Sequence, residues 1–89
     1  MKIKKGFVLR EMAGGVSVVV GVGEMSSQLK GYLTLNESGA IIWKALEKGG
    51  SVEDVVKAIL NEYEVSEELA TKDAIAVIEK IKEIGALDD

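Results

Sequence analysis

The side chains that usually perform catalysis are sparse in this sequence. It contains no histidine and no cysteine, which removes the commonest general base, the thiol nucleophiles and the usual ligands of zinc, iron–sulfur and copper sites. Ser26 and Ser27 stand side by side, but no motif supports a serine–lysine mechanism around them. We therefore predict no catalytic residue, no metal site and no cofactor.

Carboxylates are the one plentiful reactive group. Glu67, Glu68 and Asp73 fall in a predicted helix, where they fit the helix dipole and a solvated face better than a cation site. No calcium-binding loop pattern is present. Gly21-x-Gly23 lacks the third glycine and the directly following helix of a dinucleotide-binding turn. These patterns favour a binding module over an enzyme.

Two hydrophobic periods divide the 89 residues. Before Asn36 the period is near 2, typical of strands, and after it the period is near 3.6, typical of helices. No linker rich in Gly, Pro or Ser separates the two parts. We expect one α+β domain over residues 1–89, with a winged helix-turn-helix-like order of three antiparallel strands followed by three helices.

The predicted sheet begins with a hairpin over residues 7–12 and 16–22. A two-residue turn at Gly14-Gly15 would pair Leu9 with Val20. That register places one set of side chains on the core: Phe7, Leu9, Val18, Val20 and Val22. We expect a loop over residues 23–30 and a third strand over residues 31–35, with Leu33 and Leu35 on one side and Tyr32 and Thr34 on the other. Lys2, Lys4 and Lys5 are expected to form a frayed, solvated end.

Three capped helices are expected to follow. Asn36 is a suitable N-cap for a largely buried first helix over about residues 37–48, with Trp43 packed inside. Ser51 and Asp54 resemble a capping box for the second helix, and Ser66 caps the third. The predicted core stripe of the second helix is Val52, Val55, Val56, Ile59, Leu60 and Tyr63. That of the third helix is Ala70, Ala74, Val77, Ile78, Ile81 and Ile84, with Ile75 off the stripe as an exposed residue or a contact point.

Charge is distributed unevenly along the chain. Residues 1–46 carry six Lys/Arg and three Asp/Glu, whereas residues 47–89 carry five and twelve. The third helix is acidic on balance, which disfavours docking on nucleic acid. No apolar run approaches the length of a membrane span. No continuous apolar segment follows the basic first residues, so we expect no signal peptide. We predict a cytoplasmic protein that binds neither nucleic acid nor membrane.

The segment from Tyr32 to Trp43 reads YLTLNESGAIIW and resembles the strand-to-helix signature of the coenzyme PQQ synthesis protein D (PqqD) family. The similarity continues through the Gly-Gly turn, the Ser-x-x-Asp helix start and the Glu-Tyr-x-Val stretch at residues 62–65. It ends with Asp73 in the closing helix and Gly85-Ala86-Leu87 after it, so it covers roughly residues 6–88.

This resemblance implies a non-catalytic module that recognises precursor peptides. Such domains bind the leader of a ribosomally made peptide by strand addition and present the peptide to a modifying enzyme, often a radical S-adenosylmethionine (SAM) enzyme. By position, the resemblance assigns the leader to the third strand and to one flank of the third helix. The implied contact residues are Gly31, Tyr32, Leu33, Thr34, Leu35, Asp73, Ala76, Val77 and Lys80.

Several alternatives stay open from the residues alone. A small winged-helix DNA-binding regulator shares the expected fold, and a structural module that self-pairs through its sheet edge, such as a homodimer, would also use the third strand. Helical spacing places Asp73, Ala76 and Lys80 on one flank of the third helix and Thr71, Ile75 and Lys82 on the other. We expect the first flank to face the strand.

Overall fold

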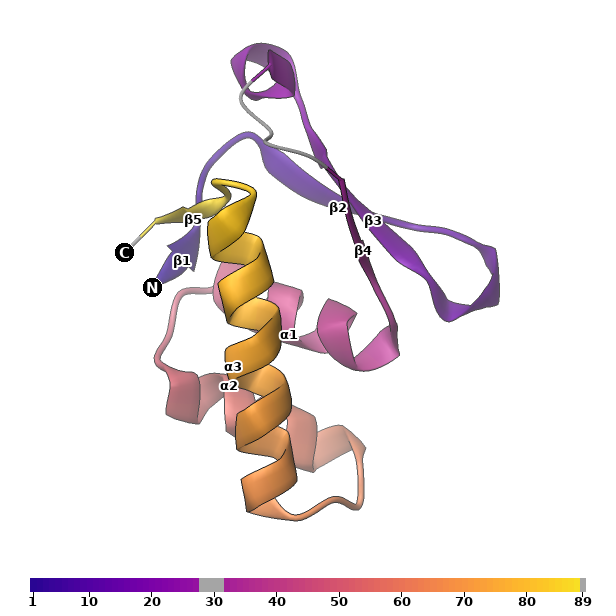
Figure 1. The fold of residues 1–89 in the computed structure, drawn as a ribbon, viewed down its shortest axis with the longest axis vertical. Helices are drawn as coiled ribbons and strands as arrows, with labels where there is room; N and C mark the ends of the chain where they lie inside the picture. Colours follow the sequence, from indigo (N-terminus) through magenta and orange to yellow (C-terminus); the bar gives the residue numbers. More distant parts are fainter. Residues whose placement is uncertain (28–31, 89) are drawn as a thin grey trace.

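The computed structural model describes residues 1–27 and 32–88 (Figure 1). Strands β2 (Phe7–Glu11), β3 (Ser17–Gly21) and β4 (Leu33–Leu35) form an antiparallel sheet in the order β2-β3-β4. Helices α1 (Glu37–Glu47), α2 (Val52–Glu62) and α3 (Glu67–Glu83) follow. The predicted α+β fold with a βββααα order is confirmed. In Figure 1 the β2–β3 hairpin projects away from the helices.

The register of this hairpin differs from the sequence prediction. Leu9 pairs with Val19 and Arg10 pairs with Val18, one residue away from the predicted partners. The cause is the turn, a three-residue 3-10 stretch η1 (Ala13–Gly15), which the Met12 N–H closes by donating to the Val16 carbonyl at 2.7 Å. A three-residue turn shifts the register by one residue relative to a two-residue turn. Because side chains alternate along a strand, this shift moves the side chains of β3 to the opposite face of the sheet.

The shifted register changes which residues of β3 reach the core. Val19 is fully buried and Ser17 is 4% exposed, whereas Val18 and Val20 are only half-buried and Val22 is 42% exposed. The prediction that Val18, Val20 and Val22 face the core was therefore wrong. On β2 the expected face is confirmed: Phe7 is buried and the half-buried Leu9 packs against the core.

A second, two-stranded sheet joins the two ends of the described chain. β1 (Lys2–Ile3) pairs antiparallel with β5 (Leu87–Asp88), and Figure 1 shows the two ends side by side. Ile3 is buried, and the Met1 backbone exchanges hydrogen bonds with Gly50 at 3.0 and 3.2 Å. The expectation of a frayed end was therefore wrong. Strands as short as β1 and β5 show no detectable hydrophobic alternation, so the sequence did not reveal them. The side chains of Lys2, Lys4 and Lys5 are nevertheless exposed.

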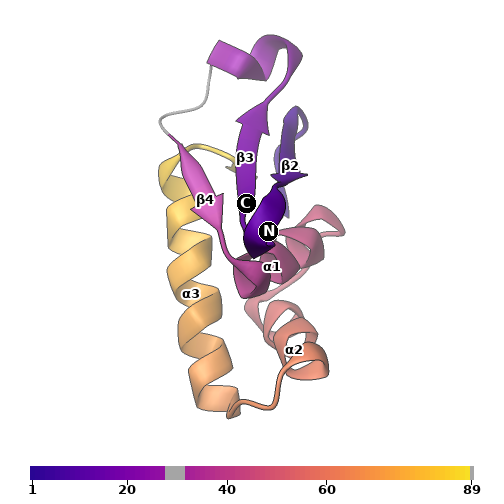
Figure 2. The same cartoon turned by 90° about the vertical axis from the view of Figure 1, so that its right-hand side faces the viewer.

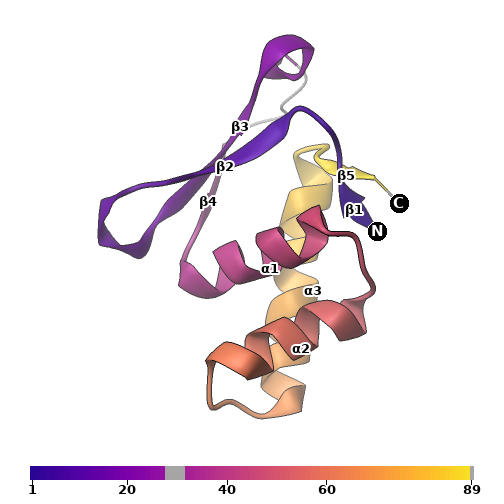
Figure 3. The ribbon, with the colours of Figure 1, turned by 180° about the vertical axis from the view of Figure 1, so that it is seen from behind.

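Helix α1 lies between the sheet and α2 (Figures 2 and 3). Its Ile42, Trp43 and Leu46 are fully buried, as expected for a central helix. The indole Nε1 of Trp43 is buried without a hydrogen-bond partner among the described residues. Around this helix, the core stripes of α2 and α3 face inward as predicted, but Leu60 is 36% exposed. Val52, Tyr63 and Val77 are half-buried and pack against the core.

The predicted helix starts are confirmed by their hydrogen bonds. The Asn36 side chain accepts from the Gly39 N–H at 2.9 Å, and Ser66 Oγ accepts from the Leu69 N–H at 3.1 Å. Ser51 and Asp54 form the reciprocal capping box. The Ser51 N–H donates to the Asp54 carboxylate and is the main reason why the pKa of Asp54 is lowered from its ordinary value.

Two further details separate the structure from the sequence prediction. The predicted loop contains a 3-10 turn, η2 (Gly23–Ser27), whose Met25 packs against the core. Tyr32 precedes β4 rather than lying within it, and Gly31 lies outside the described residues. Within residues 1–27 and 32–88, none of the helices has the length and apolar character needed to cross a membrane.

Candidate functional site

Strand β4 lies at an edge of the three-stranded sheet. Its one neighbour among the described strands is β3, and its other edge is turned toward α3 (Figure 2). An edge strand presents backbone N–H and C=O groups that no ladder uses, so it is a template for one more strand. The space beside β4 is therefore a candidate binding site.

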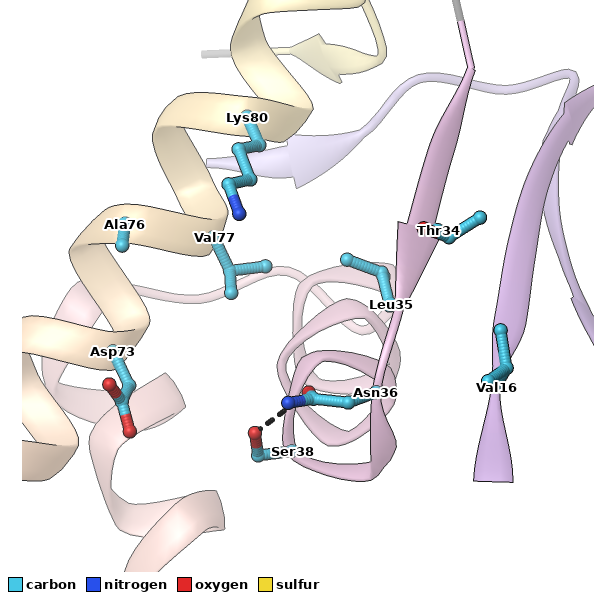
Figure 4. Close-up of a pocket in the computed structure, with 9 residues that line it drawn as sticks. All are labelled: Val16, Thr34, Leu35, Asn36, Ser38, Asp73, Ala76, Val77 and Lys80. Carbon is cyan, nitrogen blue, oxygen red and sulfur yellow. Dashed lines mark hydrogen bonds between the residues drawn. The ribbon is translucent and has the colours of Figure 1, made fainter. Parts of the chain in front are cut away.

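A groove of about 480 Å³ occupies this space. It is lined by Val16, Thr34, Leu35, Asn36, Ser38, Asp73, Ala76, Val77 and Lys80. Figure 4 shows Leu35 and Val77 pointing toward each other from β4 and α3, with Ala76 farther out on the helix. The apolar floor is thus shared by a strand and a helix that are far apart in the sequence.

Most of the residues predicted from the sequence meet in this groove. Those that line it are Thr34, Leu35, Asp73, Ala76, Val77 and Lys80. The expectation that this flank of α3 faces the strand agrees with the structure, whereas Thr71 of the opposite flank lines a separate hollow against α2.

Three predicted residues are not among the lining residues. Leu33 is 7% exposed and belongs to the hydrophobic core beneath the sheet. Tyr32, which precedes β4, is 91% exposed and outside the groove lining. Gly31 lies outside the described residues, so the structure places no part of it.

The sequence prediction missed Val16, Asn36 and Ser38 as lining residues. Asn36 was interpreted only as a helix cap, although a cap at the junction of strand and helix also borders any groove between them. Val16 reaches the site because Ser17 pairs with Leu35, which brings the preceding residue of the hairpin next to Asn36. The sequence prediction set no register between β3 and β4, so it could not reveal this neighbour.

The junction between β4 and α1 sets the shape of this groove. Asn36 Oδ1 accepts hydrogen bonds from the Gly39 N–H at 2.9 Å and from Ser38 Oγ at 3.0 Å (Figure 4 shows the latter pair). A Cβ atom on Gly39 would stand 2.9 Å from Leu35 Cβ, closer than real Cβ atoms approach. The Asn-x-Ser-Gly run therefore brings the first turn of α1 tightly against β4 and holds the edge strand in place.

The groove continues past Asp73 into a second hollow of about 440 Å³. The two hollows share Asn36, Ser38 and Asp73. The second is lined in addition by Gly14 and Gly15 of the hairpin tip, by Glu37 of α1, and by apolar side chains from α2 and the segment after it: Ile59, Tyr63 and Val65. Together the hollows form an elongated depression with apolar walls, suited to an extended chain that also inserts side chains.

Charges lie at intervals along this depression. Asp73 and Lys80 stand on one flank of α3, about 10 Å apart along the helix axis at 1.5 Å per residue. Outside this depression, near the hairpin tip, Lys44 Nζ donates to Glu11 Oε1 at 2.7 Å, and this bond lowers the pKa of Glu11 and raises that of Lys44. Among the described residues, no three His, Cys, Asp or Glu side chains cluster closely enough to hold a metal ion.

Comparison with solved structures finds the same fold bound to peptides. One similar structure is TbiB1 in complex with the TbiA(beta) leader peptide, at 27% identity and a TM-score of 0.69, covering 99% of this chain and 100% of that chain. Another is lasso peptide synthetase B1 complexed with the leader peptide, also at 27% identity and a TM-score of 0.69, covering 96% and 93%. No curated protein matches the sequence closely enough to count as a relative.

The family comparison covers almost the whole chain. The family described as coenzyme PQQ synthesis protein D (PqqD) matches residues 7–87, which span every strand of the main sheet and all three helices. This match includes the β4–α1 junction that shapes the groove. The chain therefore belongs to the PqqD family.

Proposed function

We propose that this chain is a non-catalytic recognition module that captures the leader of a ribosomally made precursor peptide. The observation that carries the proposal is the groove between the free edge of β4 and one flank of α3. Two similar structures that match nearly the full chain are complexes with leader peptides, which supports the same ligand class here.

The leader adds to β4 as a further strand. Backbone hydrogen bonds to an edge strand supply affinity without demanding a particular sequence, and alternate side chains supply specificity. On the groove side, a leader side chain packs between Leu35 and Val77, where the small Ala76 leaves room. The Asn36 side chain uses Oδ1 for its two hydrogen bonds within the chain, so its Nδ2 group is the part that donates to the leader.

The charged and apolar side chains at the two ends of the groove determine in which direction the leader chain runs through it. Asp73 attracts a basic side chain and Lys80 an acidic one, at opposite ends of the groove flank. The hollow floored by Ile59, Tyr63 and Val65 accepts a larger apolar anchor from the part of the leader that passes Asp73. A leader with a basic and an acidic residue flanking an apolar one fits this arrangement.

The bound leader holds its precursor for a separate modifying enzyme. That this enzyme is a radical SAM enzyme, and that the protein is cytoplasmic, remain predictions of the sequence resemblance and composition. The homodimer likewise remains a prediction. The acidic balance of α3 disfavours the alternative of a DNA-binding regulator.

A pair of neighbouring substitutions on α3 tests the binding mode. Ala76→Phe fills the groove, and we expect it to weaken binding of a synthetic leader by about tenfold or more, equivalent to roughly 1.4 kcal/mol. The leader is that of the precursor peptide this chain serves, and its affinity is measured by calorimetric titration. Amide shifts should concentrate in β4 and α3.

Ile75→Phe is the matched control. Ile75 is 48% exposed and is not among the lining residues of the groove, so its variant should bind the leader within about twofold of the original chain. Equal affinity of both variants, or shifts confined to α2 and the β2–β3 hairpin, would contradict the proposed mode.

A further inference from the structure

The three-stranded sheet has a second face, which the helices do not cover in the described structure. Alternation places Phe7, Val19 and Leu35 on the core side, where the helices pack (Figure 1). The register then assigns the intervening residues to the opposite side, called the outer face. These residues are Val8, Arg10, Met12, Val16, Val18, Val20, Val22, Tyr32 and Thr34.

The outer face is apolar although it is open. Met12 is 58% exposed, Val16 and Val22 are each 42% exposed, and Tyr32 is 91% exposed. An antiparallel sheet with one solvated face usually alternates apolar residues inside with polar residues outside. Here valines occupy both outward positions of β3, and contiguous apolar surface of this kind marks a protein interaction site.

Charge on this face argues against a second copy as its occupant. Arg10 belongs to the outer face, and none of the residues assigned to that face is a carboxylate. Packing two copies face to face would bury Arg10 in an apolar interface without an acidic partner, and an unpaired buried charge is costly. A different protein that carries an apolar surface with a carboxylate complements the face.

The outer face is continuous with the proposed leader site. Thr34 pairs with Val18 on the outer face and also lines the groove at the free edge of β4. A strand added to β4 extends the sheet and directs alternate side chains to each of its faces. The outer face and half of the leader side chains would then form one surface that a single partner contacts.

We propose that the outer face docks the enzyme that modifies the precursor peptide, through an apolar surface with a carboxylate opposite Arg10. The inference rests on the proposed function, because the leader completes the surface. The enzyme then recognises this chain and its bound leader together, so that loaded modules are preferred over empty ones.

The experiment uses the full chain, the synthetic leader and the purified enzyme that modifies the precursor peptide. Binding of the enzyme to the chain–leader complex is measured by biolayer interferometry, and leader affinity by separate titration. We expect Arg10→Glu to weaken enzyme binding by about tenfold and the double change Val18→Thr, Val20→Thr by about fivefold. Leader affinity should stay within about twofold, since neither change alters the groove lining.

Ile75→Thr is the matched control, because it makes the same kind of change at an exposed apolar residue away from this face. Enzyme binding that is equally strong in all variants, with leader binding intact, overturns the docking proposal alone. Failure of the unaltered chain to bind the leader overturns the proposed function instead. Self-association in sedimentation that Arg10→Glu abolishes would identify a second copy as the occupant and contradict the proposal.

Discussion

Both faces of the three-stranded sheet carry valine side chains, but these valines have different roles on the two faces. On the inner face, Val19 is fully buried and belongs to the hydrophobic core that the sheet and the helices share. On the outer face, its neighbours Val18 and Val20 are half-buried, with no described helix above them. Valine therefore serves stability on one side and, by our proposal, recognition on the other. Composition alone does not distinguish these roles, because exposure is decided by the register.

The largest expected effect on stability comes from a residue in the core on the inner side of the sheet. Trp43→Ala removes a fully buried indole and should lower the free energy of unfolding by about 3–5 kcal/mol. Trp43→Phe should cost less, because it leaves a smaller cavity and also removes the indole N–H, which is buried without a partner among the described residues. Urea unfolding followed by circular dichroism measures both. A Trp43→Ala variant as stable as the original chain would show that the ring is peripheral.

A matched pair of valine substitutions tests the two faces directly. Val19→Thr buries a hydroxyl group and should lower the free energy of unfolding by about 1–3 kcal/mol. Val20→Thr exposes its hydroxyl to water on the outer face and should change stability by no more than about 0.5 kcal/mol. The same urea experiment measures the difference. If Val20→Thr proved the more damaging, the hairpin register would be the one that a two-residue turn predicts.

The smallest expected effect concerns an ion pair on the inner side of the hairpin tip. Lys44 lowers the pKa of Glu11, so this pair stabilises the fold above the ordinary pKa of a glutamate, and the contribution is lost as pH falls through the lowered value. Both side chains are more than half exposed, which keeps the contribution small. Free energies of unfolding measured between pH 7 and pH 3 should fall slightly more for the original chain than for Glu11→Gln. Parallel curves would show that the pair does not contribute in solution.

Local signals predicted the helix cap beside the groove and the two flanks of α3, although Asn36 and Ser38 were not predicted to line the groove. The Asn-x-Ser-Gly junction combines a helix cap with a glycine, and the absence of a Cβ atom on that glycine allows the helix to lie close to the strand. Both features are encoded within a few neighbouring residues. The flank of α3 that carries Asp73, Ala76 and Lys80 follows from helical periodicity. The choice between the two flanks, by contrast, depended on the family resemblance, because periodicity treats them alike.

The sequence by itself determined the order of the elements, the helix starts and the central position of Trp43. These features depend on hydrophobic period and on hydrogen bonds between residues three or four positions apart. The tertiary structure alone decided the hairpin register, the pairing of β1 with β5 and the inclusion of Val16 in the groove. A pair of glycines permits turns of two or three residues with similar ease, and only the packing of Phe7 and Val19 on the helices selects between them. Contacts between residues far apart in the chain therefore settled which face of the sheet is free to meet a partner.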